Sequence, residues 1–314
     1  MFPADFSYAS ARSLDEALDL LAAAQADGEE AKLLAGGQSL LPMMKLRLAT
    51  PQTLIDIAGL TELTGVSNGD GTTIGALTTY RALARDPLIA GRLPAMTDAL
   101  AVLADPQVRA RGTIGGAVAH GDPASDLPAV LLALDAQVRI TARSGSRVTP
   151  LDDFLQGVFA TDLAEDEIVT AITLPPAQAA GTAYEKFEQP ASHLPLAGVC
   201  AALTVENEVI TSAKVAVTGV AGRPFRARHS ERALVSAPAT PDSLAAAAAS
   251  VADGVRPLSD QHASGPFRLH LAEVLTRRAL TRALARATQP TTSSGVLPGA
   301  IAPSSTPDPG RRQP

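Results

Sequence analysis

The chain has 314 residues, of which 46% are hydrophobic, so it can fill the cores of several globular domains. A formal net charge of -6 and the absence of Trp argue against a nucleic-acid surface, an anionic-membrane surface and base stacking on single strands. The single cysteine, Cys200, excludes internal disulfides, a CxxC zinc site and a self-contained iron–sulfur cluster.

Residues 1–58 are expected to form a small α/β subdomain. Residues 2–8 can form a strand, and Ser13 is placed to cap a helix whose apolar residues recur at helical spacing. Residues 31–35 are expected as a buried strand, and residues 53–58 as a second short strand. The alternation of strands and helices favours an α/β layer, with a boundary near Gly59.

A glycine loop stands between that first buried strand and the next helix, in the segment LLAGGQSLLPMMKLRLA at residues 33–49. Gly36 and Gly37 permit a sharp turn and a close backbone approach, because neither carries a Cβ. Ser39 occupies the expected N-cap position of a helix over residues 40–48. Unpaired N–H groups at this helix start suit a phosphate, but a simple tight turn remains an equal alternative for this segment alone.

Residues 59–176 are expected to form a second subdomain. Two strands should flank a hairpin turn at residues 67–71, and helices should follow Thr78 or Thr79 and cover residues 93–103. Asp105 and Pro106 are expected to end that helix and lead into a second glycine loop, RGTIGGA at residues 111–117. Later elements are a helix capped by Ser125, a hairpin at residues 136–143 and 147–149, and a strand at residues 167–174.

Pro175 and Pro176 mark the expected start of a C-terminal α+β domain over residues 177–288. Strands at residues 183–187, 196–206 and 209–219 suggest an antiparallel sheet, and helices at 230–235, 241–253 and 266–288 follow. Residues 289–314 lack periodicity and are rich in Pro, Ser, Thr and Gly, so a disordered tail is expected there.

The paired glycine loops suit a ligand with two phosphates, for which a dinucleotide is the natural candidate. Neither loop matches GxGxxG, and no GxxxxGK[ST] or GxSxG segment occurs, so Rossmann, P-loop and α/β-hydrolase sites lack support. Another dinucleotide fold is therefore expected.

The segments AGGQSLLPMMKLRLATPQ and RGTIGGAVAHGDPASDLPA together resemble the FAD-binding medium subunits of molybdenum hydroxylases, most of all those of carbon monoxide dehydrogenases. The resemblance continues through YEKFEQPAS and HLAEVLTRRALTRAL and reaches about Ala287. It implies an α+β chain, with a two-subdomain FAD-binding fold of the vanillyl-alcohol-oxidase-like (PCMH) type followed by the C-terminal antiparallel sheet and helices.

The same resemblance implies the cofactor-binding residues. One side of the FAD pyrophosphate would be held by Ala35, Gly36, Gly37, Gln38, Ser39 and Leu40, and the other by Thr113, Ile114, Gly115, Gly116 and Ala117. Asp126 would accept hydrogen bonds from ribityl or ribose hydroxyls, and Tyr184 and Lys186 would lie near the isoalloxazine. Gln38 departs from a His in carbon monoxide dehydrogenases, which weakens an inference of that substrate, and Ala117 departs from Asp or Asn. No residue of this chain is expected to be catalytic or to bind a metal.

The implied function is electron relay by a non-covalently bound FAD. Electrons would come from [2Fe-2S] clusters in a small subunit, which receive them from a molybdenum cofactor in a large subunit, within a dimer of heterotrimers. Quinone, NAD or oxygen would accept them. The chain opens without a signal-peptide pattern and holds no long uncharged apolar run, so we expect no transmembrane segment and a cytoplasmic complex, free or held at the inner face of the membrane. Alternatives are a nucleotide-binding assembly or regulatory subunit, and a free-standing flavoprotein oxidase.

Other polar residues allow structural interpretations. His120 could contact the cofactor or cap a turn, and the remaining histidines lack metal-ligand spacing, so surface or packing roles are expected for them. Cys200 is expected as a small core residue, and Arg277 and Arg278 as a solvated helix end. Lys186 could also be an ordinary exposed strand lysine, since only the resemblance directs it toward the flavin.

Overall fold

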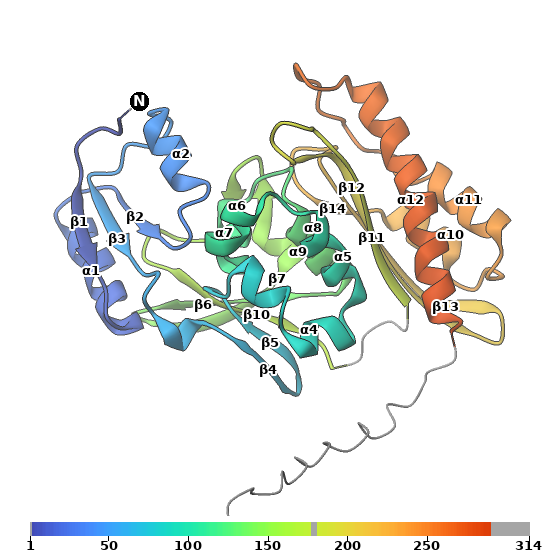
Figure 1. Ribbon diagram of the computed structural model, residues 1–314, viewed down its shortest axis with the longest axis horizontal. Coiled ribbons are helices and arrows are strands. Elements are labelled where there is room, and N and C mark those ends of the chain that lie inside the picture. Colours follow the sequence, from blue (N-terminus) through green and yellow to red (C-terminus); the bar gives the residue numbers. More distant parts are fainter. Residues whose placement is uncertain (1, 177–180, 290–314) are drawn as a thin grey trace, which may run out of the picture.

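The computed structural model describes residues 2–176 and 181–289, which form three main sheets in succession along the chain (Figure 1). The first is a parallel sheet of three strands, and the others are antiparallel sheets of five and four strands. Each sheet contributes to its own buried core. The combination is an α+β fold, as the sequence predicted. The proposed disordered tail lies outside the described residues, apart from Gln289.

The N-terminal elements are β1 (Ser7–Ser10), α1 (Leu14–Ala26), β2 (Ala31–Leu34), α2 (Leu40–Lys45) and β3 (Thr53–Asp56). The sheet order is β1-β3-β2. The Ser13 side chain accepts from the Glu16 N–H at 3.1 Å, so the predicted cap of α1 is confirmed. The strand expected from residue 2 begins only at Ser7, and β2 is half-exposed rather than buried because this small sheet has little cover.

The second part of the chain contains the five-stranded sheet and most of the short helices. Its elements are η1 (Thr61–Leu63), β4 (Val66–Gly69), β5 (Gly71–Gly75), α3 (Tyr80–Leu83), α4 (Pro87–Arg92), α5 (Pro94–Val102), α6 (Pro106–Arg111), α7 (Ile114–His120), α8 (Asp126–Ala133), β6 (Gln137–Ala142), β7 (Gly145–Pro150), α9 (Leu151–Phe154), β8 (Leu155–Gly157), β9 (Ala160–Thr161) and β10 (Ile168–Leu174). The strand order is β4-β5-β10-β6-β7, which confirms both predicted hairpins.

The region of the second glycine motif differs from the expected loop. Residues 106–111 form α6, Gly112 follows as its C-cap, and Gly115 and Gly116 lie in the first turn of α7. Asp105 caps α6 by accepting from the Val108 N–H at 2.8 Å. The Asp105-Pro106 pair predicts the end of the preceding helix, but proline at the first helical position also begins a new helix, here α6.

The C-terminal elements are β11 (Gly181–Glu188), β12 (Pro195–Glu206), β13 (Val209–Thr218), β14 (Phe225–Arg226), α10 (Arg228–Leu234), α11 (Pro241–Ala249) and α12 (Gly265–Ala287). The three predicted strands and the antiparallel sheet are confirmed. Figure 1 shows α12 along one side of this sheet and the helices of the second part on the other. Because both faces are covered, β12 is buried almost throughout instead of alternating.

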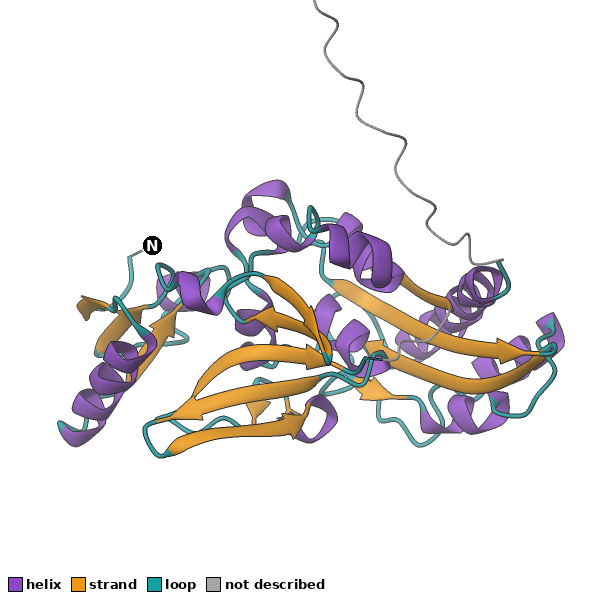
Figure 2. Ribbon diagram, turned by 90° about the horizontal axis from the view of Figure 1, so that it is seen from below, coloured by secondary structure: helices purple, strands orange, loops and turns teal. Residues whose placement is uncertain are grey.

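Alternate rows of side chains on this sheet pack into the core of the second part on one face and into the core beneath α12 on the other. Figure 2 shows helices on both faces of the sheet. Tyr184, Cys200 and Ala216 are paired across the strands and pack into the core of the second part. The adjacent row packs into the separate core beneath α12. Asp98 of α5 accepts from Arg282 and Arg286 of α12 at 2.6 and 2.7 Å, which fixes α12 to the second part of the chain. Among the described residues, no helix is long and apolar enough to cross a membrane.

Candidate functional site

The first glycine motif forms the turn between β2 and α2. Gly37 has a φ of +72°, a left-handed conformation that glycine adopts without strain. Ser39 stands at the N-cap of α2, but its hydroxyl makes no capping bond. No described residue accepts a hydrogen bond from the backbone N–H groups of residues 36–40. Consecutive free N–H groups on a turn make a concave binding site for an anion such as phosphate.

The two glycine motifs lie against one another in the fold. A Cβ on Gly36 would lie 2.2 Å from the carbonyl oxygen of Arg111, so only glycine allows this backbone contact. A small cavity of about 60 Å³ lies at the junction, with Ala35 from the first motif and Thr113 from the second in its wall. The fold therefore brings together the two segments that the sequence linked to one pyrophosphate.

The second motif has different hydrogen-bonding properties from the first. The Ile114 and Gly115 N–H groups donate to the carbonyl oxygens of Thr78 and Ala76 at 3.1 and 2.8 Å. The next two N–H groups, of residues 116 and 117, donate to Thr113. Among residues 113–117, only the Thr113 N–H has no acceptor in the described part of the chain, so the first motif offers most of the free donors, whereas the sequence led us to expect them on both motifs. The N-terminus of α7 still faces the junction with its positive dipole.

Asp126, Tyr184 and Lys186 form a buried polar cluster. The Tyr184 hydroxyl donates to Asp126 Oδ1 at 2.7 Å, and Lys186 Nζ lies 3.1 Å from the same oxygen. Lys186 also donates to the carbonyl oxygen of Val102 at 3.0 Å. The side chains of Lys186 and Asp126 are only 3% and 5% exposed, so Lys186 is not an ordinary surface lysine. The structure brings Asp126 of α8 to Tyr184 and Lys186, which are neighbours on one face of β11 but about sixty residues away in the sequence.

Burial and charge set the protonation of this cluster. Burial raises the pKa of the Asp126 carboxyl, while the Lys186 ammonium and the Tyr184 hydroxyl oppose that rise. Burial also raises the pKa of Tyr184, and the nearby Asp126 charge adds to the effect. Tyr184 consequently keeps its proton and acts as a donor. The ammonium of Lys186 is the positive charge available to a neighbouring ligand.

The C-terminal sheet positions the cluster. A Cβ on Gly198 would lie 2.3 Å from the Tyr184 hydroxyl oxygen, so glycine at this position makes room for the phenol. The buried Thr218 hydroxyl lies 2.9 and 2.8 Å from the carbonyl oxygens of Pro123 and Ser125, which fixes the chain just before Asp126. These supporting residues have no motif in the sequence that could have revealed them.

Tyr80 was also missed by the sequence analysis. Its ring lies against Gly112, where a Cβ would come within 2.5 Å of it. Burial raises the pKa of Tyr80, and the charge of Asp126 raises it further. Tyr80 therefore packs on the second glycine motif, close enough to Asp126 for that charge to affect its pKa.

The remaining polar residues considered in the sequence analysis occupy packing or surface positions. His120 ends α7 and stacks on Phe159 with ring centroids 5.0 Å apart, and burial lowers its pKa. Cys200 is buried and packs in the core, as predicted, and burial raises the pKa of its thiol. Arg277 and Arg278 are exposed as expected, but they lie within α12 rather than at its end.

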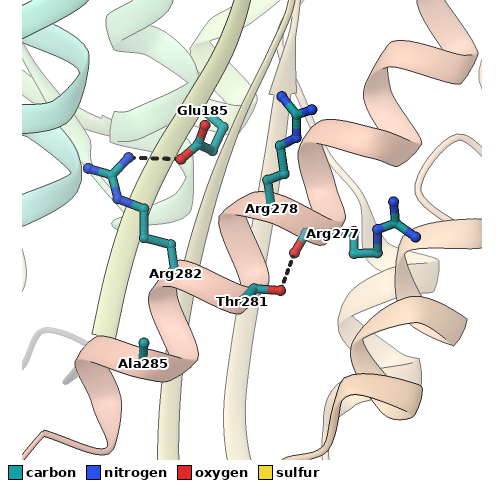
Figure 3. Close-up of a pocket in the computed structure, with 6 residues that line it drawn as sticks. All are labelled: Glu185, Arg277, Arg278, Thr281, Arg282 and Ala285. Carbon is teal, nitrogen blue, oxygen red and sulfur yellow. Dashed lines mark hydrogen bonds and ion pairs between the residues drawn. The ribbon is translucent and has the colours of Figure 1, made fainter.

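A groove of about 470 Å³ lies beside α12, and Figure 3 shows the residues that line it. Arg282 points toward Glu185 and donates to it at 2.8 Å, while Arg277 and Arg278 point elsewhere. None of the sequence-predicted site residues lines this groove. The described residues also hold no group of three or more His, Cys, Asp or Glu side chains suited to a metal ion.

Two family models together match most of the chain. Residues 4–177 match the FAD binding domain in molybdopterin dehydrogenase, and residues 182–283 match the CO dehydrogenase flavoprotein C-terminal domain. The chain therefore belongs to the family of FAD-binding medium subunits of molybdenum hydroxylases, and the predicted PCMH-type fold is confirmed.

Individual relatives support the same conclusion. The chain is 38% identical to the glyceraldehyde dehydrogenase medium chain of Sulfolobus acidocaldarius, over 89% of this chain and 98% of the relative. It is 37% identical to the carbon monoxide dehydrogenase medium chain of Hydrogenophaga pseudoflava, over 91% and 99%. A solved structure of carbon monoxide dehydrogenase from Hydrogenophaga pseudoflava, which lacks the Mo-pyranopterin moiety, matches with a TM-score of 0.87 and 38% identity, over 91% of this chain and 99% of the other.

The site residues fit FAD. Free N–H groups at residues 36–40 suit the pyrophosphate, and Gly36 allows the two motifs to approach. In the cluster of Asp126, Tyr184 and Lys186 the phenol already donates to Asp126, so the carboxylate and the ammonium are the groups that suit the hydroxyls of a ribityl chain and a flavin ring.

Proposed function

We propose that this chain binds FAD non-covalently and relays electrons from a [2Fe-2S] small subunit to an external acceptor. The observation that carries the proposal is the row of free N–H groups at residues 36–40, held against the Thr113 motif. The molybdenum large subunit would oxidise the substrate and reduce the clusters. This chain, with one cysteine, has too few thiolates to ligate a [2Fe-2S] cluster by itself.

We assign the residues around FAD as follows. Residues 35–40 and 113–117 would hold the pyrophosphate, with hydrogen bonds donated mainly by the first motif. Asp126 would accept from ribityl or ribose hydroxyls. Tyr184 and Lys186 would lie beside the isoalloxazine, where a cation favours the anionic reduced flavin. Residues 1–58 and 59–176 would form the two FAD subdomains, and residues 177–288 a supporting domain.

The partners of the relatives guide the proposed assembly. Because those proteins are named medium chains, we infer that this chain assembles with a small and a large subunit, as a dimer of heterotrimers in the cytoplasm. The complex could be held at the inner face of the membrane, and quinone, NAD or oxygen would be its acceptor. The relatives named above act on glyceraldehyde and carbon monoxide, so the family does not fix the substrate.

A flavin spectrum tests the proposal. The full chain is incubated with FAD, freed of excess cofactor by gel filtration, and examined by visible spectroscopy before and after a chemical reductant. We expect flavin bands that bleach on reduction. Absence of the bands would exclude FAD binding, and bands that do not bleach would favour the alternative of a regulatory nucleotide site.

A further inference from the structure

The buried ammonium of Lys186 is connected to the protein surface by two further side chains. Glu188 Oε2 lies 3.6 Å from Lys186 Nζ, and Glu188 Oε1 lies 3.1 Å from His193 Nδ1. The side chain of Lys186 is 3% exposed, whereas those of Glu188 and His193 are 38% and 43% exposed. A line of charged groups therefore runs from the proposed flavin environment to solvent.

The turn between β11 and β12 holds His193 in this line. The Gln189 N–H donates to the Leu194 carbonyl and the His193 N–H donates to the Gln189 carbonyl, both at 2.9 Å. His193 has a φ of +57°, a left-handed conformation that costs a non-glycine residue about 1 kcal/mol or more. Gly or Asn would adopt it more easily, so the imidazole occupies a position that the backbone alone does not favour.

We propose that Glu188 and His193 are positioning residues that set the effective charge of Lys186 toward the flavin and couple electron uptake at FAD to proton uptake at His193. This inference rests on the proposed function. With His193 neutral, Lys186, Asp126 and Glu188 together carry one net negative charge, and protonation of His193 cancels it. A flavin that accepts two electrons from the iron–sulfur donor and one proton from solvent gains one negative charge, which favours a second solvent proton on His193.

The charged and titratable groups facing this line come from three elements. They are Tyr80 of α3, Asp126 of α8, and Tyr184, Lys186 and Glu188 of β11. Burial raises the pKa of both tyrosines, so they remain neutral near pH 7. Asp126 is in contact with Lys186, so a change in its protonation acts on Lys186 directly. Protonation of His193 acts on Lys186 through Glu188. Histidine is the side chain whose ordinary titration falls in the neutral range.

The test is the pH dependence of the flavin reduction potential in the full chain loaded with FAD. Potentials are measured by spectroelectrochemical titration over roughly pH 6 to 8, where histidine titrates. The variants are His193→Asn, which tolerates the left-handed backbone, and Glu188→Gln, which keeps the shape of the side chain. Glu185→Gln is the control, because Glu185 is on the same strand but pairs with Arg282 at the groove.

We expect the wild-type potential to fall with pH more steeply than that of His193→Asn, by up to about 30 mV per pH unit, the two-electron equivalent of a tenfold change. Glu188→Gln should lose the same part of the slope and have a higher potential at neutral pH, whereas Glu185→Gln should match wild type. NMR titration of the His193 ring should show more protonation in the reduced chain. Equal slopes in wild type and His193→Asn would overturn the inference and leave FAD binding intact. A chain that holds no reducible flavin would instead refute the proposed function.

Discussion

Gly115 and Gly116 are neighbours in the first turn of α7 but have different surroundings. A Cβ on Gly115 would lie 2.4 Å from the Cβ of Ala76, with backbone atoms close behind it. A Cβ on Gly116 would meet only the Thr113 hydroxyl, at 2.8 Å. Gly115 is thus required for packing of the helix, while Gly116 can be changed with less effect on the fold. A substitution at Gly116 can therefore test cofactor binding without disrupting the fold.

We expect Gly116→Val to abolish FAD retention, because its side chain would block the approach of the pyrophosphate to the motif. The free energy of unfolding of the apoprotein should fall by only about 1 kcal/mol, the value of a helix cap disturbed at Thr113. The flavin-to-protein absorbance ratio after gel filtration and urea unfolding measure the two effects. Gly91→Val is the control, since no atom lies within 4 Å of that Cβ. Full flavin occupancy in Gly116→Val would place the pyrophosphate elsewhere.

Lys186 and Asp126 form a pair in which each side chain offsets the burial of the other. Lys186→Met should lower the free energy of unfolding by about 3 kcal/mol at neutral pH, because it leaves a buried carboxylate without its cation. Adding Asp126→Asn to that variant should restore most of the loss, since no buried charge remains. Urea unfolding of the wild type, both single variants and the double variant measures the pairwise energy.

The deficit of Lys186→Met should also depend on pH. Burial raises the pKa of Asp126 above its ordinary value of 3.8, and loss of Lys186 removes an opposing effect. A carboxyl with a raised pKa binds its proton more tightly in the folded state, so its stabilising contribution is complete below 3.8 and is lost as pH rises through the folded pKa. The deficit should therefore shrink in acid. An unchanged deficit across this range would contradict the assigned pair.

At the scale of elements, sequence signals predicted the helices and turns whose stabilising contacts are between residues close in the sequence. Ser13 caps α1, and the turn at residues 67–71 joins β4 to β5 as expected. The same Asp-Pro signal was interpreted as a stop at Asp105, although it also starts α6, because the dipeptide suits either role. Gly115 and Gly116 were expected in a loop because glycine has a low helix propensity. The close contact of Gly115 with Ala76, which no local signal reveals, favours the helix instead.

An ion-pair cluster connects the β6–β7 hairpin to the segment that enters β10. Arg147 Nε donates to Glu167 Oε1 at 2.6 Å, and Arg147 also pairs with Asp162 at 2.8 Å. The hydrogen bond from Arg147 lowers the pKa of Glu167 below its ordinary value of 4.5. A carboxyl with a lowered pKa stabilises the fold above 4.5 and loses that contribution as pH falls through its folded pKa.

We expect wild type to lose about 1 kcal/mol more of its free energy of unfolding than Glu167→Gln does as pH falls below the ordinary glutamate range. The value is small because the Arg147 side chain is 38% exposed and solvent screens the pair. Urea unfolding at neutral and acid pH measures it. Glu165→Gln, at an exposed neighbouring position, should behave as wild type. If Glu167→Gln and wild type lost stability in parallel, the ion pair would have no role in acid sensitivity.

At the scale of the whole molecule, the sequence contained the parts of the site but not their contacts. The two glycine motifs were predicted as a dinucleotide site from their own residues, whereas Asp126, Tyr184 and Lys186 were found only through the resemblance. The fold brings Asp126 to within 3.1 Å of Lys186. Tyr80, Gly198 and Thr218 were missed because their roles depend on contacts with residues separated from them in the sequence, which no motif marks. Glu188 and His193 lie close to Lys186 in the sequence but were also missed, since a turn with a left-handed His193 has no simple sequence signature.

The proposed FAD residues come from all three sheets and their connections, so cofactor binding should stabilise the molecule as a whole. The N-terminal core is small and includes Leu77 and Ile168 from the second part of the chain, so its stability depends on that contact. FAD at about 100 times its Kd should raise the free energy of unfolding by about 2.7 kcal/mol. FMN, which lacks the adenylyl half, should raise it less at the same concentration, because it offers the two glycine motifs one phosphate instead of two. Unfolding is followed by far-ultraviolet circular dichroism, since the chain has no Trp to report it. Equal stabilisation by FMN and FAD would mean that the motifs do not hold a pyrophosphate between them.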